Sequence, residues 1–246
     1  MKLIFKIILF FLISTNLNGR NVGETEITTE DGIEVFQNEK YYLLKKNVRI
    51  VSDDFILDAN NVKIDFDNNL YDITKLDAEG NVKFDSNEYE INGVGETLIL
   101  VVKTEDLKIE GTGSELRTEN INMFSDGFIK INNQNGDFSL KGLNSKLINE
   151  TIVIKAEFIE GTFLNNANNK EIIYLNAIDN NISYVKNNDT EMYAKKINFN
   201  QKNSLIELID NVTIIRGEEK ITGDYGTLDT RNNSYKIKLI QIIKTR

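Results

Sequence analysis

Four residue types are missing from the 246-residue sequence: cysteine, histidine, proline and tryptophan. Without cysteine and histidine, the chain lacks the best nucleophile, the commonest general base and the commonest metal ligands. Cysteine is also required for disulfides, so stability must come from burial and backbone pairing. The absence of proline suits long β ladders, because every backbone N–H can then be paired. We therefore expect neither an enzyme nor a cofactor- or metal-binding protein.

The net charge of −9 disfavours nucleic acid or an anionic membrane surface as a partner. Residues 1–19 have the layout of a secretory signal peptide, with Lys2 and Lys6 followed by the apolar run 7–13. This run is much shorter than the roughly 20 residues that span a bilayer. We expect residues 1–19 to be cleaved and the rest of the chain to be exported. An uncleaved N-terminal anchor is the alternative.

Short runs of alternating apolar and polar residues fill the rest of the sequence, and this period of two is typical of β-strands. One stretch, 211–229, aligns without a gap to 47–65, and looser copies begin near residues 81, 128 and 181. The uneven starts argue against a rigid solenoid. No segment shows a sustained helical period and no linker interrupts the chain. The sequence therefore predicts an all-β fold, with residues 20–246 as one elongated domain.

Nearly every predicted strand has one apolar face, and two such sheets packed together bury a core about 10 Å thick. Two interpretations of this core remain open. In one, side chains simply fill it. In the other, the sheets stay slightly apart and the interior accepts an apolar ligand. The periodicity alone does not distinguish them.

Some of the repeated segments also have a residue pattern that can be compared with known families. The segments concerned are 31–34, 46–50, 57–65, 78–84, 210–214, 221–224 and 228–229. They resemble the LptA/OstA-like family of periplasmic lipopolysaccharide-transport proteins. The resemblance implies an open, twisted antiparallel β-jelly roll with an apolar interior, in which each G-N-V-x-I motif opens a strand. The resemblance extends to individual residues over 31–100 and 208–239. Between these two segments, only the overall strand architecture is similar.

The resemblance further implies that the chain shelters the lipid A acyl chains of lipopolysaccharide in an apolar groove, as part of a bridge between the inner and outer membranes. The implied partners are lipopolysaccharide and, edge to edge, further copies or other jelly-roll proteins of the bridge. The strands around Ile33 and Val35 and around 235–239 are the expected joining edges. The residues expected to line the groove are Val48, Ile50, Phe55, Leu57, Ile64, Phe66, Val82, Phe84, Ile91, Leu98, Leu100, Phe138, Leu140, Ile182, Tyr184, Val212 and Ile214.

The chain departs from the resemblance in length, since removing 19 residues from 246 leaves more than one short family module needs. A structural or membrane-linked scaffold partner of the same export system is therefore an alternative. A secreted β-helix carbohydrate-active enzyme is a further one, with the pairs 53–54 and 218–219 as its carboxylates, although adjacent acids in turns are usually just solvated. A surface adhesin built as a regular β-solenoid is disfavoured by the uneven repeat spacing.

Overall fold

The computed structural model describes residues 24–150, 152–166, 169–232 and 234–238, so the signal peptide expected at 1–19 lies outside the described residues. The described part contains nineteen β-strands and two single-turn 3-10 helices. None of its helical segments is long and apolar enough to cross a membrane. The elements are β1 (Glu26–Thr28), β2 (Ile33–Phe36), β3 (Tyr41–Val51), β4 (Phe55–Phe66), β5 (Ile73–Ser86), β6 (Ile91–Val101), η1 (Val102–Thr104), β7 (Asp106–Glu110), β8 (Ser114–Arg117), β9 (Ile121–Ser125), β10 (Phe128–Asn132), β11 (Asp137–Lys141), β12 (Lys146–Asn149), β13 (Ile152–Lys155), β14 (Phe158–Asn166), β15 (Asn169–Asn187), β16 (Thr190–Asn200), η2 (Gln201–Asn203), β17 (Leu205–Arg216), β18 (Glu219–Asp229) and β19 (Ser234–Lys238).

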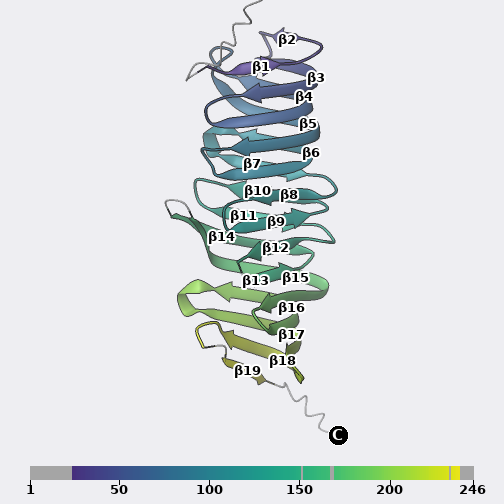
Figure 1. Cartoon of the computed structure of the whole chain (residues 1–246), viewed down its shortest axis with the longest axis vertical. Helices are drawn as coiled ribbons and strands as arrows, with labels where there is room; N and C mark the ends of the chain where they lie inside the picture. The colour runs from purple at the N-terminus through teal and green to yellow at the C-terminus, as the bar shows by residue number, and fades with distance from the viewer. Residues whose placement is uncertain (1–23, 151, 167–168, 233, 239–246) are drawn as a thin grey trace, which may run out of the picture.

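The strands stack along the long axis of the molecule as one antiparallel meander that folds back on itself (Figure 1). Two ladders result. Ladder 1 runs through β2, β3, β4, β5, β6, β7, β10, β11, β14, β15, β16, β17, β18 and β19. Ladder 2 runs through β1, β3, β4, β5, β6, β8, β9, β12, β13, β15, β16, β17 and β18. The long strands belong to both ladders because each bends near its middle. The predicted antiparallel β-jelly roll is thus confirmed.

The bends are built by residues that accept a left-handed backbone. Asn47, Asn81 and Asn211 have φ values of 51°, 52° and 56°, and asparagine tolerates this conformation better than most residues. The strand register shifts at each of these bends. The expectation that the G-N-V-x-I motif opens a strand is therefore wrong. The motif lies in the middle of a strand, where it turns the chain from one ladder to the other.

Between the ladders, inward side chains form apolar rows that run across successive strands. One row on ladder 1 is directly paired from strand to strand and is buried at every position from β3 to β17. Its members are Leu44, Val62, Ala78, Leu98, Ile109, Ile129, Leu140, Ile159, Ala177, Ile197 and Leu208. Burying such side chains contributes about 0.8 kcal/mol per methylene, so these rows hold the two ladders together.

Candidate functional site

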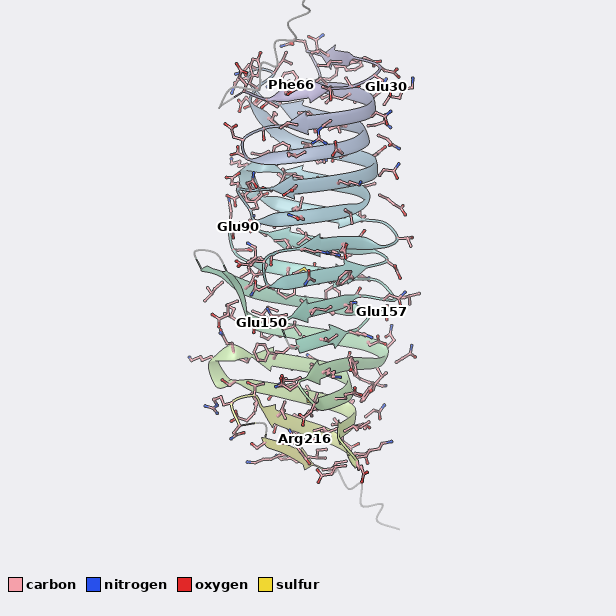
Figure 2. All side chains as sticks on the ribbon, in the orientation of Figure 1. Glu30, Phe66, Glu90, Glu150, Glu157 and Arg216 are labelled. Atoms are coloured by element: carbon pink, nitrogen blue, oxygen red, sulfur yellow. The ribbon has the colours of Figure 1, made fainter. Side chains whose placement is uncertain are left out.

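The roll has a closed side and an open side. Figure 2 shows Glu30 and Glu157, which lie where the chain passes between ladders, at one side of the molecule. Glu90 and Glu150, which lie in turns at the outer ends of strands, are at the other side. The closed side is therefore formed by the bends. Along the other side, which we call the seam, the strand ends of the two ladders face each other, and among the described residues no backbone pairing joins them.

Most of the residues predicted to line the interior do face it. Fourteen of the seventeen are buried: Val48, Ile50, Leu57, Ile64, Phe66, Val82, Phe84, Ile91, Leu98, Leu100, Phe138, Leu140, Val212 and Ile214. Phe55 is partly buried against this core, with its ring 5.8 Å from the ring of Phe84.

Ile182 and Tyr184 are placed differently from the prediction. Strand β15 changes register between Ile178 and Ser183, so the inward positions after the bend are Ser183 and Val185. The Ser183 hydroxyl donates to the carbonyl of Lys195 at 3.2 Å, which satisfies this polar group inside the roll. Ile182 is 40% exposed, and Tyr184 lies on the outer face with its ring 5.2 Å from that of Tyr193. The prediction failed because it counted inward positions from Asn181 as from Asn47, whereas the buried positions of β15 are odd-numbered on both sides of the bend, at Ala177 and at Ser183.

An apolar cavity of about 140 Å³ lies between the ladders in the C-terminal half of the roll. Ladder 2 contributes β12, β13 and the second half of β15, and ladder 1 contributes the first half of β15, β16 and β17. Its lining comprises Leu147, Asn149, Ile152, Ile154, Glu171, Ile172, Leu175, Val185, Ile197, Phe199, Gln201 and Ile206. None of the seventeen predicted residues is among them. The apolar–polar alternation at 152–154 and 197–199 could have indicated inward side chains there, but these segments lie where the sequence repeats are least regular.

The polar lining residues mark the mouth of this cavity at the seam. The side-chain amide of Gln201 donates to the Glu171 carboxylate, both on ladder 1. On ladder 2, the Asn149 amide donates to the carbonyl of Asn120 at 3.2 Å. A ring of polar side chains around an apolar interior is the usual arrangement of a site that receives an apolar ligand from water.

Asn120 also bridges the seam next to the cavity. Its amide nitrogen donates to the carbonyl of Lys170 at 2.8 Å, and its amide oxygen accepts from the backbone N–H of Lys170 at 3.3 Å. Ladder 2 is thereby joined to the start of β15 by a side chain that acts as a backbone partner. The Lys170 ammonium lies 5.0 Å from the centre of the Phe163 ring, and burial lowers the pKa of this lysine.

The N-terminal half of the roll is packed more closely. Ile109 of ladder 1 reaches Gly93 and Gly95 of ladder 2, and a Cβ added at Gly93 would lie 2.3 Å from Ile109 Cδ1. A side chain at Gly93 would therefore require the end of the Ile109 side chain to move.

At both ends of the roll, inward-facing rows reach solvent. Ile33 and Val35 of β2 are 51% and 46% exposed, and Ile221 of β18 is 36% exposed. Ile33 and Ile221 are the exposed first members of inward-facing rows, and the later members of both rows are buried. The expected joining edges at β2 and β19 are indeed the first and last described strands of ladder 1.

The arrangement offers little for chemistry among the described residues. They contain no group of three or more acidic side chains placed to hold a metal ion. The acidic pairs 53–54 and 218–219 are exposed on turns and at a strand start. What the described chain provides is an apolar interior with a polar mouth.

A family model described as "LptA/(LptD N-terminal domain) LPS transport protein" matches twice, over 28–137 and 129–234. No curated protein matches the sequence. Among solved structures, the chain is similar to LptH, the LptA-homologous periplasmic component of the lipopolysaccharide transport device of Pseudomonas aeruginosa. The identity is 13%, the TM-score is 0.42, and the match covers 51% of this chain and 89% of LptH.

Proposed function

Since the chain belongs to the LptA/LptD N-terminal-domain family of lipopolysaccharide transport proteins, we propose that it shelters the acyl chains of lipopolysaccharide between its two ladders while the lipid crosses the periplasm. One observation carries this proposal. The apolar cavity lies between the ladders, and its polar mouth lies at the seam. An acyl chain can enter there from the side while its polar head group stays outside.

The volume of the cavity limits how much of a lipid it can hold. A cavity of about 140 Å³ is smaller than the roughly 300–1,000 Å³ of sites that enclose a whole small ligand. An entire acyl chain therefore requires the ladders to part along the seam. Each methylene that enters contributes about 0.8 kcal/mol, and the side-chain bridge from Asn120 is a small opposing cost of about 1–2 kcal/mol.

The double family match bears on the length of the chain. The two matched segments overlap at 129–137, in the region of β10 and β11, and both ladders continue through this overlap without a break. We propose that residues 20–246 form one elongated domain with a single interior, about twice as long as one family copy. One chain would then carry a lipid over two modules before it passes to a neighbour.

The exposed ends suggest how neighbours join. Edge strands present unpaired N–H and C=O groups that a further strand can pair with. Ile33 and Val35 at the β2 edge would be covered by such a partner, either a second copy or another jelly-roll protein of the bridge. The apolar rows would then continue from one protein into the next.

Photo-crosslinking tests the lipid site. A benzoylphenylalanine is placed at Ile152 or Phe199 in the cavity wall, at Ile50 or Phe84 in the N-terminal half, and at outward Thr213 as the control. With lipopolysaccharide present, we expect the cavity positions to capture lipid most strongly and Thr213 to capture none. If folded protein captures no lipid at any inward position, the proposal is wrong.

A further inference from the structure

Strands β14 and β15 extend beyond the rest of ladder 1 as a two-stranded arm. The pairing of β14 with β11 ends at Thr162, and the pairing of β15 with β16 ends at Tyr174. Beyond these residues, 163–166 of β14 pair with 169–172 of β15 and with no other described strand. Figure 1 shows this part of β14 projecting from the stack on the seam side of the roll. We call the two segments 163–166 and 169–172 the strap.

A β-bulge marks the base of the strap. Thr162 pairs with Tyr174, but Phe163 pairs with Ile172, so Ile173 is an extra residue without a partner. A bulge bends its strand and increases the local twist, and this one directs the strap out of ladder 1. A two-stranded ribbon without further neighbours is only marginally stable. The closed position of the strap therefore depends on its contacts with the roll, and the bulge is the point at which it can pivot.

The inner face of the strap closes the interior at the seam. Phe163 is 1% exposed, its ring lies 5.9 Å from that of Phe138, and its backbone N–H donates to the carbonyl of Gly136 at 2.9 Å. Ile172 is 8% exposed and lines the apolar cavity. Leu164, on the opposite face, is 49% exposed. The strap thus has an apolar inner side that covers the cavity and an outer side that faces solvent.

Side chains of both ladders fasten the strap. On the ladder 2 side, the Asn120 amide donates to the carbonyl of Lys170 and accepts from its N–H, as a neighbouring strand would. On the ladder 1 side, the Gln201 amide donates to the Glu171 carboxylate. Closure also buries the Lys170 ammonium, and desolvating a charge opposes the stabilisation from the apolar face. A single side chain therefore takes the place of a whole strand and can be released on its own.

We propose that the strap is a hinged lid over the cavity: it pivots at the bulge, releases Asn120 and admits an acyl chain from the side. This inference rests on the proposed function and specifies where along the seam a lipid enters. Opening exposes Phe163 and Ile172, and an entering acyl chain covers this apolar surface again. The empty chain therefore favours the closed position, whereas a lipid stabilises the open one. The ladders then part at the strap first rather than along the whole seam.

Thiol labelling tests the opening without any lipid. The chain has no native cysteine, so Ile197→Cys provides a single reactive group in the cavity wall, at a position that is 1% exposed. Adding Asn120→Ala should speed its reaction with a small methanethiosulfonate reagent about tenfold, because both bonds to Lys170 are lost. Val62→Cys is the control, since Val62 is equally buried in the same row but lies on β4. Its labelling should not respond to Asn120→Ala.

A reversible link tests lipid entry. Glu119→Cys and Glu171→Cys lie at the exposed chain neighbours of the two residues that fasten the strap to ladder 2, and a reducible bis-maleimide joins them. Capture of lipopolysaccharide by a benzoylphenylalanine at Phe199 should slow about tenfold in the linked form and recover on reduction. The same link between Lys146→Cys and Lys155→Cys, which are paired within ladder 2, should leave capture unchanged.

Two results would overturn the proposal. In the first, Asn120→Ala leaves the labelling of Ile197→Cys unchanged or speeds that of Val62→Cys equally. In the second, the linked form captures lipid as fast as the reduced form. If no variant captures lipid, the proposed function is wrong, and the labelling still decides whether the strap opens. Circular dichroism verifies folding, and the linked and reduced forms are compared within one folded variant.

Discussion

The cavity between the ladders makes a quantitative prediction about Val185. This residue is 1% exposed and lies in the cavity wall, paired with Ile154 and Met192 on the neighbouring strands. An unfilled cavity costs roughly 24 cal/mol per Å³, so 140 Å³ corresponds to about 3 kcal/mol of unrealised packing. Val185→Leu adds one methylene to this space and should stabilise the protein by about 0.8 kcal/mol. For a chain of this size, that raises Tm by about 2 °C.

The matched control is Val48→Leu. Val48 is also 1% exposed, but it lies in the N-terminal half and is not among the residues that line this cavity. The same added methylene there should destabilise the protein by about 1–3 kcal/mol through overpacking. Thermal unfolding followed by circular dichroism measures both changes. Opposite signs for the two variants are the expected outcome.

Lipid capture completes this test. Because Val185→Leu occupies space that an acyl chain would use, it should weaken capture of lipopolysaccharide, and the bulkier Val185→Phe should weaken it further. Val48→Leu should capture lipid as the wild type does once its lower stability is allowed for. If Val185→Leu destabilises the chain like the control, the cavity is not usable space. If Val185→Phe is folded and captures lipid normally, the cavity is not the lipid site.

Three further predictions concern the seam, the bends and pH. Asn120→Ala removes the bridge to Lys170 and should cost about 1–2 kcal/mol, with faster hydrogen exchange at the start of β15. Asn211→Val places a β-branched residue at φ 56° and should cost about 1–2 kcal/mol in denaturant unfolding, whereas Asn211→Gly should be nearly neutral. Hydrogen bonds from Arg231 lower the pKa of Asp229 to about 2. The stability they give is therefore present above pH 4 and lost as pH falls towards 2. Asp229→Asn should reduce the fall in Tm between pH 4 and pH 2. If Tm falls in this range as steeply as in the wild type, the Asp229–Arg231 hydrogen bonds are not the source of this pH dependence.

Much of the architecture could be predicted from alternation because period two directly specifies which side chains face inward. The prediction holds wherever a strand is counted from a correct starting point, as for Val48 and Ile50 before the β3–β4 turn. It fails for Ile182 and Tyr184 because this copy was counted from Asn181 as if it matched Asn47. The register of β15 is interrupted up to Ser183, so the count starts one residue too early, and a one-residue slip moves every side chain to the other face. The composition of the bend, a run of aspartate and asparagine, looks like an ordinary turn in the sequence.

The position of the cavity could not be predicted in this way. It depends on whether side chains from two different ladders are large enough to meet across the interior. At Gly93 and Ile109 they meet so closely that a Cβ at the glycine would lie 2.3 Å from Ile109 Cδ1. Around Val185 they leave a gap. Both places have the same alternating pattern, so the difference appears only when the two ladders are brought together.

The bends explain why the family resemblance says so little about the ligand. Its clearest motif places Asn47, Asn81 and Asn211 in the left-handed conformation in the middle of their strands. These residues make the chain pass from one ladder to the other, and by doing so they create both an interior and a seam. They do not line the cavity. The motif therefore specifies a roll with a seam along one side, while the side chains between the ladders determine the shape of the cavity. Under the proposed function, two members that share every bend would differ in the lipid they carry, and the C-terminal cavity wall is where that difference would lie.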